Sequence, residues 1–265
     1  MDAGAGNLAL GKSSSAAGTI SFGAGVAKNT IDNTIRSYVD SSTVNSLGAM
    51  SVTARDTSTI DAVAIGGAIS VSISGGASGS GAGAGASIDN TITNGIESFI
   101  QNGSTIVTGG NLSLKAENTA SITSRSIGGS LSVAKAAGAS GAVSIGTAIV
   151  NNNLGTDSKR HSVRAYIGAD GNVYDTTRVN TTGNVSLTAN SNPNLDTIAV
   201  AASAAIAASA VGAAFSGAGG SINNNLKTTT ATIIQNNPIT PLGDTIIATA
   251  VSYTHLTLPT NSNVV

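Results

Sequence analysis

The chain has 265 residues, of which 12 are basic and 13 acidic, so its net charge is −1. This balance provides no basic surface for nucleic acid, and we expect no nucleic-acid partner. The absence of cysteine excludes disulfides and thiolate metal sites, and the absence of tryptophan, with 3% aromatic residues, leaves Val, Ile, Leu and Ala to fill the core.

Three sequence elements recur along the chain. An isoleucine that precedes an Asn-containing turn begins the first element at Ile31, Ile88, Ile149 and Ile222. The second element is an aromatic or aliphatic step at Tyr38, Phe99, Tyr166 and Ile233. The third is a run of alternating polar and apolar residues that begins at Met50, Leu112, Val185 and Thr245. The alternation predicts half-buried strands, and the self-similarity predicts a repeat architecture.

The spacing divides the chain into units. The opening elements are 57, 61 and 73 residues apart, which predicts a β-solenoid over residues 31–250 with units 31–87, 88–148, 149–221 and 222–250. Residues 1–30 read as a partial first repeat, in which Leu8-Ala9-Leu10 is a weak third element. The stretch from each third element to the next opening holds at 35–36 residues, so we expect this Ala/Gly-rich interval to be the packed part. We further expect each unit of about 60 residues to make more than one coil, with Val, Ile and Leu inward and Ser, Thr and Asn outward.

Two stretches allow more than one structure. The run Gly75–Ser87 has the composition of a flexible linker, but its place in the fixed-length interval favours an ordered strand. Residues 198–215 are Ala-rich and uncharged, and could form a buried helix, a marginal membrane span or a strand. Strand is favoured because the equivalent stretches of the other units alternate.

The tail, residues 251–265, matches no repeat. Its string SYTHLTLPT resembles a translated sequencing adapter, so we expect residues 251–265 to be an artefactual extension that is disordered or loosely attached.

Candidate chemistry concentrates in two insertions of the third unit. Residues 154–162 and 169–177 hold most of its charges and predict protruding loops. If the chain contacts a ligand, we expect the contact at Asp157, Lys159, Arg160 and His161, with His161 solvated. Asp170, Asn172 and Asp175 are a weak calcium candidate, but an ordinary Asx/Gly turn is favoured, and we expect no metal and no cofactor.

No catalytic constellation emerges from the sequence. Asp32 and Asp89 fall at equivalent corners, but later copies have Val150 and Asn223 there, so a turn position explains the set better than paired catalytic acids. The runs Asn151–Asn153 and Asn223–Asn225 predict stacked asparagine ladders. We therefore expect no enzyme.

The combined pattern resembles large bacterial exoproteins of the filamentous-haemagglutinin-like and leukotoxin-type adhesin class. The residues that carry the resemblance are Asn33–Val39, Asn94–Ile100, Gly110–Ala116 and Gly183–Ala189. The resemblance implies a right-handed parallel β-helix, secreted or at the bacterial cell surface, acting in cell adhesion and virulence. The N-terminus lacks a signal-peptide pattern, so we expect an internal fragment of a longer protein.

The leading expectation is thus a non-catalytic structural or adhesive segment of an adhesin. Its expected partners are a host-cell or matrix surface, protein or glycan, and neighbouring repeats of a longer chain. The alternatives are a β-helix enzyme that acts on polysaccharide and a part of a pore-forming exotoxin.

Overall fold

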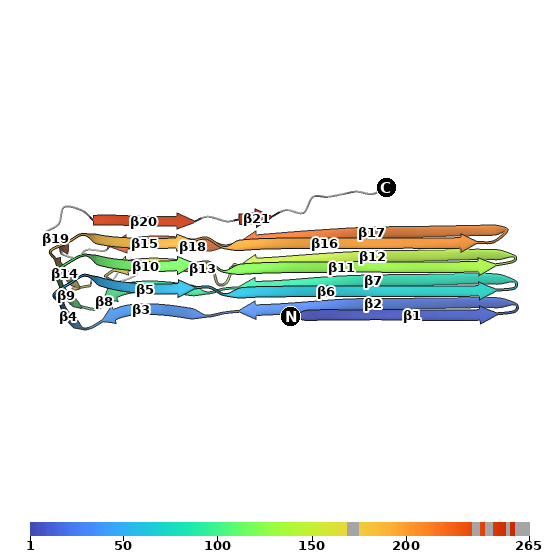
Figure 1. The fold of residues 1–265 in the computed structure, drawn as a ribbon, viewed down its shortest axis with the longest axis horizontal. Coiled ribbons are helices and arrows are strands. Elements are labelled where there is room, and N and C mark those ends of the chain that lie inside the picture. Colours follow the sequence, from blue (N-terminus) through green and yellow to red (C-terminus); the bar gives the residue numbers. More distant parts are fainter. Residues whose placement is uncertain (169–174, 235–238, 242–245, 253–254, 258–265) are drawn as a thin grey trace.

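The chain forms a parallel β-solenoid, as the sequence predicts (Figure 1). The structure is a computed structural model that describes residues 1–168, 175–234, 239–241, 246–252 and 255–257. Each sheet takes one strand from each successive turn of the chain, and every pairing between described strands is parallel.

Five strands make one coil, and the order repeats. Coil 1 contains β1 (Asp2–Ser13), β2 (Ala16–Ile31), β3 (Thr34–Asp40), β4 (Thr43–Ser46) and β5 (Met50–Asp56). Coil 2 contains β6 (Thr59–Ser74), β7 (Ala77–Ile92), β8 (Gly95–Gln101), β9 (Thr105–Thr108) and β10 (Leu112–Asn118). Coil 3 contains β11 (Ser121–Ala136), β12 (Ala139–Leu154), β13 (His161–Ile167), β14 (Arg178–Thr181) and β15 (Val185–Ser191). Coil 4 contains β16 (Asn194–Ala208), β17 (Val211–Leu226), β18 (Thr228–Ile234), β19 (Ile239–Pro241) and β20 (Ile246–Ser252), and β21 (His255–Thr257) follows.

Each repeat makes one coil, so the expectation of more than one coil per repeat was wrong. Asp2 pairs with Val63, Val63 with Arg125 and Arg125 with Ile198, which gives coils of 61, 62 and 73 residues. The coil is long because its first two strands run out and back as a flat arm (Figure 1). The three shorter strands that follow form a compact part, here called the head.

The head has the predicted orientation of side chains. In β10 the apolar Leu112 and Leu114 are fully buried, while Ser113 and Lys115, each the next residue along the strand, are half-buried. Aliphatic side chains from all three head sheets form one core, whose burial drives this part of the fold.

The outer part of the arm, away from the head, inverts that orientation, so the expected inward placing of Val, Ile and Leu was wrong there. At the base of the arm the expectation is confirmed, because Ile60, Ile88 and Ile122 are buried in a second apolar core. In β6 the buried side chains include Ser70 and Ser72, whereas Ile69 and Ile73 point outward and are 42% and 41% exposed. The reason is the close approach of the two arm sheets. A Cβ placed on Gly66 would lie 1.9 Å from the carbonyl oxygen of Gly85 in the facing sheet, so only small side chains fit between them.

The register corrects part of the predicted alignment. Ile88 lies beside Ala27 and Val150, while Ile31 lies beside Ile92, so the opening element was misaligned by four residues in coil 1 and by one in coil 3. The cause is that several isoleucines and asparagines recur within a few residues of each other.

The other two elements were aligned well. Tyr38, Phe99, Tyr166 and Ile233 share one position of the register, and so do Met50, Leu112 and Val185. In coil 4 the partner of Val185 is Ile246 rather than Thr245.

Residues 1–30 are an arm rather than a partial third element. Leu8-Ala9-Leu10 pairs with Ile69-Ser70-Val71 in the middle of the arm. This explains why Ile31 follows Leu10 by only 21 residues, whereas the other intervals between a third element and the next opening are 35–36 residues long.

The two ambiguous stretches are strands. Gly75–Gly76 is the turn of the arm and the rest of the Gly-rich run lies in β7, while residues 198–215 lie in β16 and β17. None of the described residues forms a helix that could cross a membrane. Of the tail, Val251 and Ser252 lie in β20, and β21 pairs with β16; residues 258–265 fall outside the described part.

Candidate functional site

Within the first predicted insertion, 154–162, residues 155–160 join β12 to β13, and this loop is anchored to coils on both sides of it. Lys159 forms an ion pair with Asp32 of coil 1, and Lys227 of coil 4 forms one with Asp157. The hydrogen bond from Lys159 lowers the pKa of Asp32, and that from Lys227 lowers the pKa of Asp157. Arg160 is exposed. The loop therefore spans the stack on its outside, where Asp157, Lys159 and Arg160 can meet a ligand.

His161 does not share this exposure, and the expected solvated histidine was wrong. It is fully buried as the first residue of β13, and neither ring nitrogen has a hydrogen-bond partner. Burial lowers the pKa of His161 to about 4, against the opposing effect of the Asp56 carboxylate. A neutral, enclosed imidazole cannot contact a ligand at the surface.

The calcium candidate is only partly described. Asp170 and Asn172 lie outside the described residues. Asp175 accepts hydrogen bonds from the backbone N–H groups of Asn102 and Gly103, at 2.8 and 2.9 Å, and so caps a turn of the coil below. Burial raises the pKa of Asp175, but these hydrogen bonds outweigh it and the pKa is lowered. Within the described ranges, no group of three or more His, Cys, Asp or Glu side chains could hold a metal ion.

The two aspartates expected at equivalent corners are not equivalent. Asp89 lies in β7, with its Oδ2 atom 3.9 Å from Nζ of Lys28, whereas Asp32 follows the end of β2. They are therefore not a repeated acidic position.

A buried asparagine ladder links all four coils, as the Asn runs predicted. One asparagine from each coil takes part, and each of the first three donates a hydrogen bond from its side-chain Nδ2 to the side-chain oxygen of the next, at 2.8 to 3.0 Å. The four residues are Asn29, Asn90, Asn152 and Asn224. Ser124 and Thr197 of the facing sheet bond to the same amides.

The head carries two further columns. The charged column was not predicted from the sequence, and of the aromatic column the sequence predicted the shared position but not the ring stacking. The carboxylate of Glu97 lies between two guanidinium groups, 2.6 Å from Arg36 Nε and 2.5 Å from Arg164 Nη2. Beside it, the rings of Tyr38, Phe99 and Tyr166 stack with centroids 5.0 and 4.8 Å apart. The sequence does contain a pattern that could have predicted the charged column, because Arg36, Glu97 and Arg164 each stand two positions before the aromatic residue of their unit.

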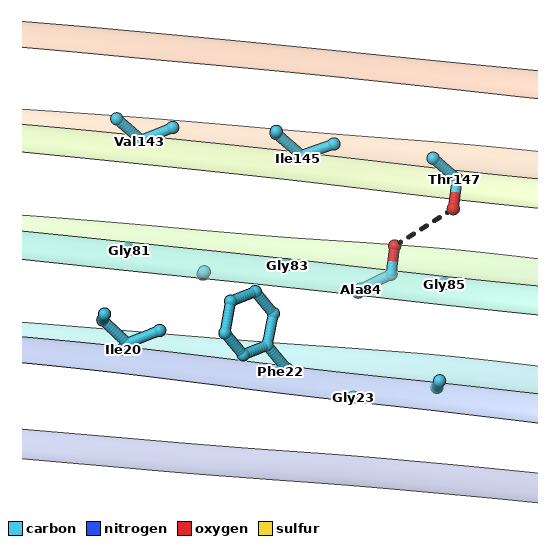
Figure 2. Close-up of a pocket in the computed structure, with 12 residues that line it drawn as sticks. Ile20, Phe22, Gly23, Gly81, Gly83, Ala84, Gly85, Val143, Ile145 and Thr147 are labelled. Atoms are coloured by element: carbon cyan, nitrogen blue, oxygen red, sulfur yellow. Dashed lines mark hydrogen bonds between the residues drawn. The ribbon is translucent and has the colours of Figure 1, made fainter.

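The arm carries an open apolar furrow on the outer face of the β17-β12-β7-β2 sheet (Figure 2). Its floor is β7, where Gly81, Gly83 and Gly85 face outward without side chains. Its walls are outward side chains of the strands on either side, and its volume is about 640 Å³. The wall residues drawn in Figure 2 are Ile20 and Phe22 of β2 and Val143, Ile145 and Thr147 of β12.

Comparison with known proteins adds no identity. No protein-family model, no curated protein and no solved structure matches the chain.

Proposed function

We propose that the chain is a non-catalytic structural and adhesive segment of a secreted or surface-exposed bacterial adhesin. The observation that carries the proposal is the continuity of side-chain columns from coil to coil. The asparagine ladder, the Arg–Glu–Arg column and the aromatic stack join successive coils rather than converge on a reacting centre. Such columns suit a rigid spacer whose coils add to one another.

The adhesive part of the proposal belongs to the loop of residues 155–160. Its six residues stand where coil 2 has only Thr93, because His161 shares the register position of Asn94, and the Asp157 side chain is 91% exposed. The partner would be a protein or glycan of a host-cell or matrix surface. The loop's charges lie on a backbone scaffold that the stack holds rigid, which limits the entropy lost on binding.

The test replaces residues 155–160 by a single threonine, the equivalent of Thr93 in coil 2, so that His161 keeps the register position of Asn94. We expect the variant to keep its fold, measured by circular dichroism and thermal melting, and to lose attachment to host cells or matrix-coated surfaces. The matched control is Arg55→Ser, which removes an exposed charge from β5 and should leave attachment unchanged. Equal attachment of the loop variant and the parent protein would show that the loop is not the contact, and a parent protein that attaches to nothing would remove the adhesive role.

A further inference from the structure

The outer face of the β17-β12-β7-β2 sheet alternates between strands with and without large side chains. Strands β2 and β12 place outward the large apolar side chains that wall the furrow. Strand β7 places glycines there, while β17 places Gly217 and Gly219 beside Ile145 and Thr147 but Phe215, 68% exposed, beside Val143. Across β2, β7 and β12 the surface thus runs ridge, furrow, ridge, and β17 continues it with low ground only at Gly217 and Gly219.

This face is large and apolar for a surface in contact with water. Phe22 is 71% and Ile145 54% exposed. Strands of 16 residues are about 50 Å long, and four side by side are about 19 Å wide, so the face covers about 1,000 Å². A stable protein–protein interface buries about 800 Å² on each partner. The area is therefore sufficient for a stable interface.

Most of the face carries no charge, and its one charged pair, Lys28 beside Asp89, lies near the head. Residues 18–26, 79–87, 141–149 and 213–221, which form the same stretch of the four strands, contain no Asp, Glu, Lys or Arg. Two copies of this face can therefore approach each other without repulsion between like charges.

We propose that this face docks onto the same face of a second copy of the chain, about a two-fold axis parallel to the strands. Such a rotation reverses the order of the strands but keeps each position along them. With the axis between β7 and β12, the β12 ridge of each copy enters the β7 furrow of the other. Val143 then lies over Gly81 and Ile145 over Gly83, because these residues share register positions.

The pairing closes on itself, because each copy contributes one ridge and one furrow to the centre. On the flanks β2 of each copy faces β17 of the other, where Phe22 lies over Gly217 and Ile20 meets Phe215, so the contact is isologous and ends at a dimer. The two stacks run in opposite directions. A fluid lipid surface would cover an apolar face of any shape. The alternation of ridge and furrow instead favours a folded protein surface of matching shape, which a second copy of the same face provides.

The test fills the furrow without disturbing the arm. A Cβ on Gly81 meets only the Ile20 side chain, at 3.8 Å, so Gly81→Val fits within its own copy, and valine favours a strand. The added side chain would collide with Val143 of the second copy. We expect sedimentation velocity of the full chain to show a dimer, and Gly81→Val to weaken its association by about tenfold or more.

Two further variants separate this geometry from simple stickiness. Gly79→Val adds the same side chain at the adjacent outward position of β7, two residues away, where the facing residue of the second copy is Gly141. Association should therefore stay within about twofold of the parent protein. Combining Gly81→Val with Val143→Ala exchanges ridge and furrow at this position and should restore association. Thermal melts of all variants check that the arm remains folded.

Sedimentation and vesicle flotation together distinguish a dimer interface from a membrane-binding face. A parent chain that is monomeric at every concentration, or a Gly81→Val variant that associates as well as or better than the parent, overturns the proposal. Flotation with phosphatidylcholine–phosphatidylglycerol vesicles adds the lipid arm: binding by the parent and by Gly81→Val alike, with no dimer, would assign the face to a membrane surface instead. The proposed adhesive role does not enter this test, because the loop of residues 155–160 lies outside the face.

Discussion

Acid should weaken the fold through the buried His161. Since Ser162 pairs with Gly95, His161 holds the position that Asn94 has one coil below. Asn94 donates hydrogen bonds to the Asp56 carboxylate and the Ser58 hydroxyl, at 2.8 and 2.9 Å.

The partners that Asn94 uses are missing one coil further on. Asn118 and Ala120 replace Asp56 and Ser58 there, and Asn118 already donates to Ser191 and accepts from the Ala120 backbone. The imidazole is therefore buried without a hydrogen-bond partner, and the Asp56 carboxylate only partly offsets the cost of charging it there.

The size of the effect follows from the two pKa values. In the unfolded chain His161 takes up a proton near its ordinary pKa of 6.5, whereas in the folded chain burial lowers its pKa to about 4. Between these values the unfolded state binds more protons, so the free energy of unfolding falls as the pH falls from about 6.5 to about 4. A difference of this size corresponds to about 3 kcal/mol.

The assay is urea unfolding followed by circular dichroism at a series of pH values, for the parent chain and for His161→Leu. Leucine is close to histidine in volume and cannot titrate. The parent chain should lose about 3 kcal/mol more than the variant between pH 7 and pH 4. The lowered pKa values of Asp32 and Asp157 place their losses below about pH 4, outside this window. Equal losses in both proteins would refute the argument that His161 is buried and neutral.

Three more substitutions test the stack, each by its free energy of unfolding. Asn152→Ala should lower the free energy of unfolding by about 3 kcal/mol, because it breaks the ladder and leaves buried partners unpaired. Asn151→Ala, on the outward side, should lower it little, and equal losses would contradict the role of the ladder. Gly128→Ala should cost about 1–3 kcal/mol, because its Cβ would lie 1.9 Å from a facing carbonyl oxygen, while Gly129→Ala, with open space around it, should gain about 0.5 kcal/mol. Glu97→Gln should cost about 1–2 kcal/mol and reduce the salt dependence of stability, since the two guanidinium groups lose their shared carboxylate; an unchanged salt dependence would argue against the charge column.

The sequence was informative about the type of fold because period and alternation survive in every unit. The alignment of Tyr38, Phe99 and Tyr166 was correct from the sequence alone, since large side chains are rare in this chain and therefore conspicuous. Isoleucine is frequent, and the alignment that rested on Ile31 and Ile88 was wrong for that reason.

What alternation cannot supply is the identity of the buried face. A run such as Ile69-Ser70-Val71-Ser72 has period two whichever side faces in, and ordinary burial of apolar residues predicts Ile69 and Val71 inside. The observed choice depends on a residue far away in the chain, because the glycine opposite Gly66 is Gly85, on the returning strand. The candidate loop was located by its charges, but the burial of His161 depends on the register of β13, which no local pattern reveals.

The inverted arm has an energetic consequence. Beyond its base, where Ile60, Ile88 and Ile122 are buried, the interior of the arm holds mainly Ser, Ala and Gly. Folding this outer part therefore removes little apolar surface from water, and backbone ladders and serine hydrogen bonds such as Ser80 to Ser70 hold it instead. The large apolar side chains that would stabilise a core, by about 1.5–3 kcal/mol each when fully buried, stay on the outside. Only contact with something beyond the arm can recover that free energy. Because the outer ridges and furrow match one another in shape and carry no charge, a second copy of the arm can bury them without first reshaping the sheet.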